Sequence, residues 1–208
     1  MSQYFHIHPD NPQRRLLHEA VKILRGGGVM AYPTDSCYAL GCMIGHKDSM
    51  ERIRALRGVD DKHHFTLVCR DLSEIARYAR VDNQQYRLLK AATPGAYTFI
   101  LEATKEVPRR LQHPRRSTIG IRIPENTVVS TLLEELGEPI LSMTFALPDD
   151  AEPLHEPSEI EARAGKRLDL IIDAGGCNHV ATTVIDLTGD TPEVLRRGGG
   201  DPARLGLD

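Results

Sequence analysis

The chain has 208 residues, of which 40% are hydrophobic and 26% are charged, and its formal net charge is −3 at pH 7. This composition is typical of one globular domain, here over residues 1–208, and it argues against a disordered chain, a collagen-like repeat and a coiled coil. The small negative charge argues against a protein that binds polyanions through its overall charge.

Apolar periodicity and capping residues predict helices and strands that alternate along the chain. In chain order we expect a helix that begins at Asn11 and ends at Gly26, a strand at 29–32, a helix at 48–56, a strand at 65–69, a helix capped by Asp71, a helix at 83–91, strands at 97–101 and 118–123, a helix at 128–136, a strand from Ile140, a short helix at 160–164, and strands at 168–173, 182–187 and 194–196. This order predicts a mixed α/β (α+β) sheet flanked by helices. Because no helix separates the last strands, part of the sheet is expected to be antiparallel.

We use the cysteines, the histidines and the N-terminus to predict where in the cell the protein lies and whether it binds a metal ion. Cys37, Cys42, Cys69 and Cys177 form no C-x-x-C pair and match neither a zinc site nor a disulfide framework. His63-His64 is the best candidate metal pair, but adjacent side chains point to opposite faces of a strand, so we expect no metal site. No apolar run reaches the roughly 20 residues of a membrane helix, and no secretory signal is recognisable. We therefore expect a cytoplasmic protein with reduced thiols and no membrane contact.

Two glycine triplets do not form a phosphate-binding loop. Gly26-Gly27-Gly28 comes before a predicted strand, so these residues are better explained as the end of a helix. Gly198-Gly199-Gly200 has no helix after it with the required spacing. If the protein binds a nucleotide, it does so without a Walker or dinucleotide fingerprint.

Small polar and basic side chains lie at the ends of several predicted strands: Thr34, Asp35, Ser36, Arg122, Ser142, Thr144, Thr182, Thr183 and Arg196. Because strand ends of an α/β sheet gather along one edge, ligands are commonly bound there. Hydroxyl and guanidinium groups together suit a carboxylate or a phosphate. The alternative is that polar residues merely end buried strands, and the pattern alone favours that alternative.

Five segments, in the same order, resemble motifs of the YrdC/YciO family. They are Ala-Tyr-Pro-Thr-Asp-Ser-Cys-Tyr-Ala-Leu-Gly at 31–41, Thr-Pro-Gly-Ala-Tyr-Thr-Phe at 93–99, Thr-Ile-Gly-Ile-Arg-Ile-Pro at 118–124, Thr-Thr-Val-Ile-Asp at 182–186 and Leu-Arg at 195–196. Each segment is modest alone, but together they are specific and cover nearly the whole chain. Residues 65–72 and 105–111 resemble the YciO branch in particular.

This resemblance implies a fold and an activity. The implied fold is a twisted mixed sheet flanked by helices, with a concave, basic cleft. The implied reaction joins L-threonine, bicarbonate and ATP into threonylcarbamoyl-adenylate and releases pyrophosphate, for use in a tRNA adenosine modification. The resemblance also implies that the chain could bind tRNA or double-stranded RNA.

Carried over by position, the resemblance assigns two sets of binding residues. The set for threonine is Thr34, Tyr38, Arg122, Ser142 and Thr182, and the set for the nucleotide is Arg57, Lys62, Thr118, Thr144 and Arg196. Arg122 would hold the threonine carboxylate in a bidentate pair, and Mg²⁺ would bridge the ATP phosphates as the one cofactor. A reaction at phosphorus needs charge stabilisation and alignment more than a protein nucleophile, so no catalytic triad is required.

The nucleotide side departs from the family pattern at two places. The family's K-x-R pair is replaced by Arg57 and Lys62 at a different spacing, with the acidic pair Asp60-Asp61 beside Lys62. The serine and asparagine of the family's S-x-N segment correspond to Thr144 and Ala146, so one amide is missing. Losing two phosphate-side elements would slow turnover on the order of a thousandfold.

Three functions therefore stay open. The first is a weak or altered synthase, and the second is an RNA-binding protein that kept the cleft. For the second, Arg109, Arg110, Arg115 and Arg116 would line a groove, and binding would weaken steeply as salt rises. Few aromatic residues lie near these arginines, which favours recognition of duplex RNA through shape and phosphates. The third is a small-molecule sensor that uses the same pocket.

Overall fold

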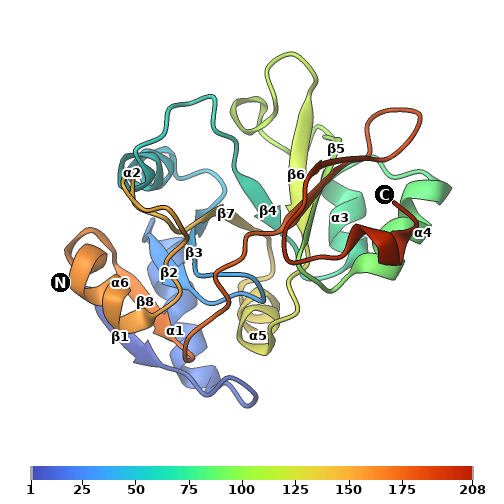
Figure 1. Ribbon diagram of the computed structural model, residues 1–208. Coiled ribbons are helices and arrows are strands. Elements are labelled where there is room, and N and C mark those ends of the chain that lie inside the picture. The colour runs from blue at the N-terminus through green and yellow to red at the C-terminus, as the bar shows by residue number, and fades with distance from the viewer. Residues whose placement is uncertain (1, 208) are drawn as a thin grey trace.

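A ten-stranded mixed sheet runs through the centre of the computed structural model, which describes residues 2–207 (Figure 1). The strands are β1 (Gln3–His6), β2 (Met30–Tyr32), β3 (Ala39–Met43), β4 (Thr66–Val68), β5 (Tyr97–Glu102), β6 (Thr118–Arg122), β7 (Ile140–Thr144), β8 (Leu170–Asp173), β9 (Thr183–Asp186) and β10 (Glu193–Arg196). Their order in the sheet is β1-β8-β2-β3-β7-β4-β6-β5-β9-β10. β1 and β8, and β5 and β9, pair in parallel, whereas β3 and β7, and β9 and β10, pair antiparallel. The predicted mixed α/β fold, with an antiparallel part at the end of the chain, is confirmed.

Six α-helices flank the sheet, and capping residues account for several of their ends. They are α1 (Arg14–Arg25), α2 (Lys47–Arg57), α3 (Leu72–Tyr78), α4 (Asn83–Ala92), α5 (Thr127–Leu136) and α6 (Pro157–Ala164), with short 3-10 helices η1 (Arg109–Leu111), η2 (Gly165–Arg167) and η3 (Pro202–Leu205). The Asp71 side chain accepts a hydrogen bond from the Glu74 amide at the start of α3, as predicted. Gly137 ends α5 with φ of 76°, a conformation that glycine adopts without strain. Among residues 2–207, no helix combines the length and the hydropathy required to traverse a bilayer.

Two strands were not expected from the sequence, β1 and β3. β3 is buried on both faces, so its residues show no polar alternation. It also contains Gly41, where a Cβ atom would come within 2.9 Å of the Tyr32 ring, so the absence of a side chain is required by packing. β1 is a four-residue edge strand that pairs with β8, far away in the sequence.

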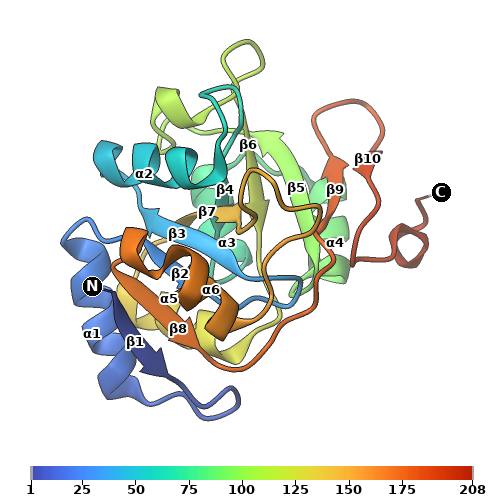
Figure 2. The same ribbon diagram turned by 60° about the vertical axis from the view of Figure 1, so that its left-hand side comes forward.

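Helices cover one face of the sheet only in part. α1 and α5, which lie together in Figures 1 and 2, pack their apolar side chains on β8, β2 and β3 and reach Val68 of β4 and Ile140 of β7. Side chains alternate along a strand, so Thr66, Ser142 and Thr144 project from the same face as Val68 and Ile140. Beyond α1 and α5, that face carries polar side chains and borders a pocket. The opposite face packs on α2, α3, α4 and α6.

Candidate functional site

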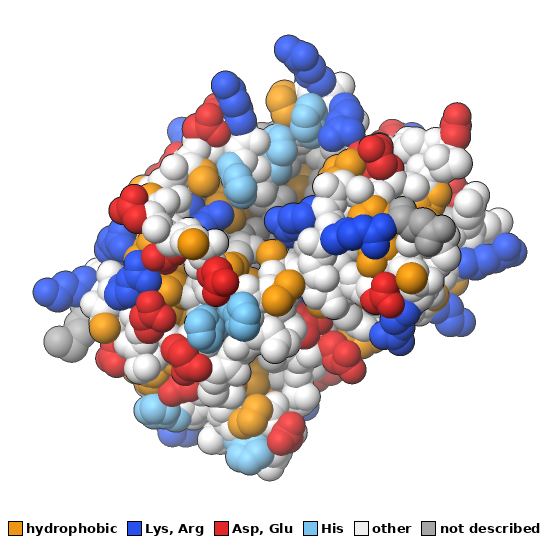
Figure 3. Space-filling model, in the orientation of Figure 1, with side chains coloured by type: hydrophobic (Ala, Val, Ile, Leu, Met, Phe, Trp, Pro, Cys, Tyr) orange, Lys and Arg blue, Asp and Glu red, His pale blue; other side chains and the backbone are white. Residues whose placement is uncertain are grey.

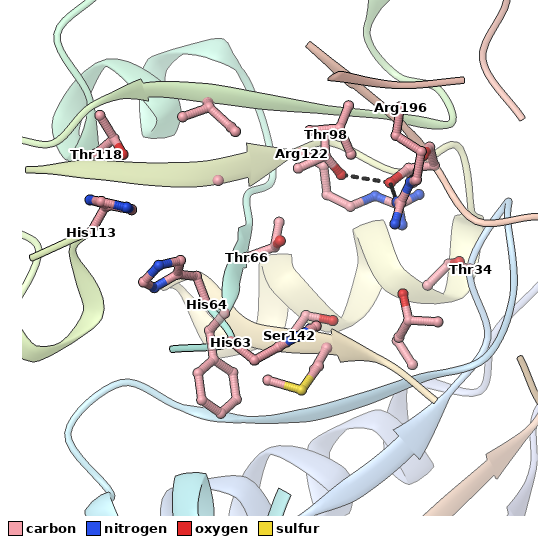
Figure 4. A pocket seen from close by; sticks show the side chains of 18 of the residues that line it. Thr34, His63, His64, Thr66, Thr98, His113, Thr118, Arg122, Ser142 and Arg196 are labelled. Carbon is pink, nitrogen blue, oxygen red and sulfur yellow. Dashed lines mark hydrogen bonds between the residues drawn. The ribbon is translucent and has the colours of Figure 1, made fainter. Parts of the chain in front are cut away.

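A pocket of about 220 Å³ lies on this incompletely covered face, over strands β7, β4, β6, β5 and β9 (Figures 3 and 4). Its apolar lining includes Phe65, Ile100, Met143 and Val184. Its polar lining is dominated by hydroxyl groups, from Thr34, Thr66, Thr98, Thr118, Ser142, Thr144 and Thr182. Three arginines, Arg116, Arg122 and Arg196, contribute positive charge. Such a lining can hold a small ligand that carries an anionic group.

Gly120, in the middle of β6, leaves space at the floor of the pocket because it has no side chain. It pairs with Thr66 of β4 on one side and with Ile100 of β5 on the other. A Cβ atom at this position would lie 3.3 Å from Oγ1 of Thr66 and 3.4 Å from Cγ2 of Thr98, so it would project among the pocket hydroxyls. Glycine thus leaves room for a ligand at the centre of the sheet.

Arg122 is the most buried charged group of the pocket, with 7% of its surface exposed. Its Nη2 donates to the Asp35 carboxylate and its Nη1 donates to Oγ of Ser36 (3.2 Å). Asp35 also accepts the amide of Glu125 (2.9 Å), which fixes the carboxylate. Within residues 2–207, the buried Nε of Arg122 has no hydrogen-bond partner. A buried guanidinium donor without a partner is costly, so a small side-chain shift that gave Nε a ligand acceptor would be stabilised.

Arg196 and Thr182 form a second polar unit beside Arg122 (Figure 4). The guanidinium of Arg196 donates from Nε (3.1 Å) and Nη2 (2.9 Å) to the carbonyl of Thr182. The hydroxyls of Thr98 and Thr182 lie 2.8 Å apart. Among residues 2–207, Arg196 has no carboxylate partner, whereas Arg122 pairs with Asp35 and Arg116 pairs with Asp186 at 2.9 Å. Arg196 therefore contributes a charge that no protein carboxylate neutralises.

Tyr32 lies beside the pocket, among the side chains that pack on α1 and α5. Its hydroxyl lies 2.6 Å from Oγ of Ser142, and the ring is fully buried. Burial raises the pKa of Tyr32 to about 12, although the bond to Ser142 and the charge of Arg122 oppose the rise. The phenol therefore stays neutral and holds the serine side chain in place. The sequence interpretation gave Tyr32 no role in the site, although this residue lies in the 31–41 segment that resembles a family motif.

The structure brings four of the five positions assigned to threonine into one pocket: Thr34, Arg122, Ser142 and Thr182 line it. Tyr38 does not line it. The Tyr38 side chain is fully buried among residues of the opposite face, and its hydroxyl donates to the carbonyl of Gly175 (2.9 Å). Tyr38 alternates with Ala39, which does line the pocket, so the pleat directs these two side chains to different faces.

Of the positions assigned to the nucleotide, Thr118, Thr144 and Arg196 line the pocket. Arg57 and Lys62 lie outside its lining. Arg57 is half-buried at the end of α2 and donates from Nη1 to the carbonyl of Ala146 (2.8 Å). Lys62 is exposed in the loop before β4. The two departures found in the sequence thus lie next to each other in space, because Arg57 is bonded to the backbone of Ala146.

The four arginines assigned to RNA divide into two groups. Arg116 lines the pocket and is paired with Asp186. Arg109, Arg110 and Arg115 are exposed in the segment between β5 and β6, and within residues 2–207 they have no carboxylate partner. Arg109 borders a separate hollow beside Arg80. The four side chains therefore do not share one groove with the pocket, and a concave basic cleft remains a prediction.

Three histidines line the pocket, and the sequence interpretation did not assign them to it. His63 and His64 lie in the loop before β4, and His113 lies before β6. The expectation that His63 and His64 face opposite sides of a strand is wrong, because β4 begins only at Thr66 and both imidazoles reach the pocket. Within residues 2–207, no group of three or more histidine, cysteine or acidic side chains could hold a metal ion.

Cys37 lines the same pocket but is poorly suited to act as a nucleophile. The residue is buried, and burial raises the pKa of its thiol above the usual value, with opposing hydrogen bonds from Ser36 and Thr144. The thiolate is the reactive form of cysteine, so a raised pKa lowers reactivity. The pocket therefore offers hydrogen bonds and positive charge but no activated thiol.

Comparisons with known proteins find similar chains over nearly the whole length of this one. The Sua5_yciO_yrdC family model, described as "Telomere recombination", matches residues 22–198. "Uncharacterized protein YciO" of Escherichia coli (strain K12) is 57% identical over 201 residues, which are 97% of this chain and 98% of that protein. The crystal structure of E. coli YciO matches with a TM-score of 0.95 at 56% identity, and the match covers 99% of this chain and 100% of that chain.

One further similar protein has a named function, and one further similar structure contains a ligand. A threonylcarbamoyl-AMP synthase of Halorhodospira halophila (strain DSM 244 / SL1) is 30% identical over 159 residues, which are 76% of this chain and 82% of that protein. The crystal structure of P. abyssi Sua5 complexed with L-threonine matches with a TM-score of 0.87 at 22% identity, over 95% of this chain and 58% of that chain. The second likeness shows a shared fold.

Proposed function

The chain belongs to the Sua5/YciO/YrdC family, and on this premise we propose that its pocket binds L-threonine and ATP and forms threonylcarbamoyl-adenylate slowly. The observation that carries the proposal is the convergence of Thr34, Arg122, Ser142 and Thr182, which are distant in the sequence, around one pocket. A relative with 30% identity is a threonylcarbamoyl-AMP synthase, which agrees with the proposed ligands.

Arg122 would bind the carboxylate of threonine. Its Nε is the buried donor that lacks a partner, and Asp35 and Ser36 hold the rest of the guanidinium in place. A fixed guanidinium binds a carboxylate at low entropic cost, because little side-chain freedom remains to be lost. The hydroxyls of Ser142 and Thr182 would complete the polar contacts.

The phosphates of ATP would lie against Thr118, Thr144 and Arg196. Asp35 and Asp186 are both paired with arginines, so these two carboxylates are not free to hold a metal ion. The hydroxyl lining nevertheless fits Mg²⁺, which is commonly bound through substrate phosphates, water and few protein oxygens. When bound, Mg²⁺ would neutralise phosphate charge, while the protein residues hold and align the reactants.

Turnover is expected to be slow because the nucleotide side lacks two donors. Ala146 has no side-chain amide, and the Nη1 of Arg57 is bonded to a backbone carbonyl. Together these losses would reduce transition-state stabilisation by several kcal/mol, on the order of a thousandfold in rate.

The direct test measures pyrophosphate release from ATP by the purified protein. Release that requires both L-threonine and bicarbonate supports the proposal, and its absence at high enzyme concentration would refute it. Thr182→Val removes a pocket hydroxyl with little change in volume and should reduce the rate. The matched control is Thr131→Val, because the Thr131 hydroxyl bonds to a carbonyl within α5 (2.8 Å), away from the pocket. Binding of threonine without pyrophosphate release would favour the sensor function.

The exposed arginines favour a second candidate function, the binding of duplex RNA. Arg109, Arg110 and Arg115 project from one segment, and no protein carboxylate within residues 2–207 neutralises them. Such side chains suit contacts with the phosphate backbone. Changing all three to alanine should weaken duplex binding and reduce its dependence on salt, by about one unit of slope for each phosphate that the protein no longer neutralises.

A control for this test changes three other exposed arginines that lack carboxylate partners within residues 2–207, Arg15, Arg87 and Arg204, to alanine. Both triple variants have the same net charge, so only the position of the missing arginines distinguishes them. Equal affinity of the two variants for duplex RNA would remove this candidate.

A further inference from the structure

The histidine end of the pocket consists of His63, His64 and His113, and neither the family motifs nor the proposed contacts use it. In Figure 4, His64 and His113 lie toward one end of the pocket, while Arg122 and Arg196 lie toward the other. The rings of His64 and His113 are 5.1 Å apart between centroids. Figure 3 shows histidine and basic side chains around the hollow in this face. The imidazoles of His64 and His113 can therefore contact one bound group, and His63 lines the same pocket next to His64 in the sequence.

The His113 ring is fixed in one tautomer. Its Nδ1 accepts the backbone amides of Arg115 (3.3 Å) and Arg116 (3.2 Å). The proton of the neutral ring therefore lies on Nε2, which is left as a donor. Nε2 of His113 can therefore donate a hydrogen bond to a bound acceptor.

His63 and His64 have no comparable restraint, and most groups that face them are basic. The pKa of His63 lies below its usual value, mainly because the ring is partly buried. The nearby Arg57, His64 and Arg196 lower this pKa further, whereas Asp60 raises it. No carboxylate within residues 2–207 pairs with Arg57 or Arg196. This part of the pocket therefore has basic groups in excess of acidic ones.

His64 lies in a similar environment. Burial and His113 hold the pKa of His64 below its usual value, with further contributions from Arg54 and Arg116. Arg54 is paired with Glu51, and Arg116 is paired with Asp186. Despite these two carboxylates, the pKa of His64 stays below its usual value. A phosphate placed among these rings would supply the missing negative charge and would favour the protonated imidazoles.

We propose that His63, His64 and His113 form a proton-coupled anion site, which binds a phosphate group when His63 or His64 takes up a proton. The proposal rests on the proposed function in one respect, because it assigns the phosphate to the nucleotide substrate. In this arrangement the histidines take the place of the displaced Arg57 and Lys62. The pocket then binds phosphate more tightly in mildly acidic solution, since more of the His63 and His64 imidazoles carry a proton there.

The test is isothermal titration calorimetry of the full chain with inorganic pyrophosphate in EDTA, at pH 6 and pH 8. Running each titration in two buffers of different ionisation enthalpy gives the number of protons taken up. The variant His63→Asn/His64→Asn keeps polar side chains of similar size but cannot be protonated. The control is His155→Asn/His179→Asn, a second pair of neighbouring rings (5.7 Å between centroids) that does not line the pocket.

At pH 6 the unaltered protein should bind pyrophosphate on the order of tenfold more tightly than the His63/His64 variant, and at pH 8 the two affinities should converge. It should also take up more protons than that variant, while the control matches the unaltered protein. Pyrophosphate itself titrates in this range, but its contribution cancels between proteins. Equal affinities and equal proton uptake in all three proteins, or no binding to the unaltered protein, would overturn the proposal.

The same titrations separate this inference from the proposed function. Proton-coupled binding of pyrophosphate by a protein that releases none from ATP supports the anion site and refutes the synthase. Threonine-dependent turnover with no difference between the His63/His64 variant and its control supports the synthase and refutes the anion site.

Discussion

Replacing Asp35 with asparagine should destabilise the protein by about 3 kcal/mol, because it leaves the guanidinium of Arg122 buried without its carboxylate. Only 9% of the Arg122 side chain and 12% of the Asp35 side chain are exposed, so water replaces little of the missing interaction. The asparagine can still accept the Glu125 amide through its oxygen, but its NH₂ group would then face the guanidinium. Ser36 alone would remain as a partner of Arg122.

The free energy of unfolding is to be measured by urea denaturation, with the melting temperature as a second readout. For a chain of this length, a loss of about 3 kcal/mol lowers Tm by roughly 6–12 °C. The control is Asp149→Asn, which changes an exposed carboxylate without an ion-pair partner within residues 2–207 and should cost no more than about 0.5 kcal/mol.

A double variant separates the buried charge from other effects of the substitution. Asp35→Asn/Arg122→Met removes both charges and fills much of the space, so it should be more stable than Asp35→Asn alone by about 1–2 kcal/mol. If Asp35→Asn costs less than about 1 kcal/mol, or if the second substitution destabilises further, the Arg122 charge is not held by Asp35 as the structure implies.

Three further predictions address the pocket, a glycine contact and a thiol. Gly120→Val fills the floor of the pocket, so calorimetry should detect no threonine binding while the far-UV circular dichroism spectrum is unchanged; retained affinity would place the ligand elsewhere. Gly200→Ala places a Cβ atom 2.5 Å from the ring of Tyr97 and should cost about 1–3 kcal/mol in urea denaturation, whereas Gly189→Ala, with 3.6 Å to its nearest neighbour, should cost less than about 1 kcal/mol; equal costs would contradict the close contact. Burial raises the pKa of Cys177 to about 11, so its reaction with a disulfide reagent should accelerate about tenfold per pH unit between pH 7 and 9; a rate independent of pH in this range would contradict the raised pKa.

Helices and most strands could be predicted because their sequences carry local signals. Asp71 and Gly137 cap helices by side-chain hydrogen bonding and by a left-handed backbone conformation, and both effects depend on neighbours in the sequence. β3 has no such signal, because burial of both faces removes the alternation that marks a half-exposed strand. Its assignment depends on pairing with β2 and β7, which only the folded chain shows.

The pocket could be predicted in part, for reasons that differ between residues. Thr34 follows β2 and Arg122 ends β6, but Ser142 is the middle residue of β7 and the pocket lies on a face of the sheet, so the predicted gathering of strand ends at one edge accounts for only part of the site. Tyr38 follows the alternation of its strand to the opposite face, which motif similarity alone does not show. The histidines depend on how two loops, before β4 and before β6, approach each other across the pocket.

The length of the pocket bears on how many ligands it can hold. Thr118 and Arg122 both line it and stand four residues apart on β6, a separation of about 13 Å along a strand. A single threonine molecule is much shorter than this separation, so threonine bound at Arg122 would leave the end beside Thr118 unoccupied. Arg122 is neutralised by Asp35 and offers mainly a hydrogen bond, which suits one carboxylate. At the other end, His64 and His113 lie beside Thr118 (Figure 4), and an anion bound there would gain charge from protons as well as from arginine. The two ends of one pocket therefore differ in their lining as well as in position, as the proposed joining of an amino acid to a nucleotide would require.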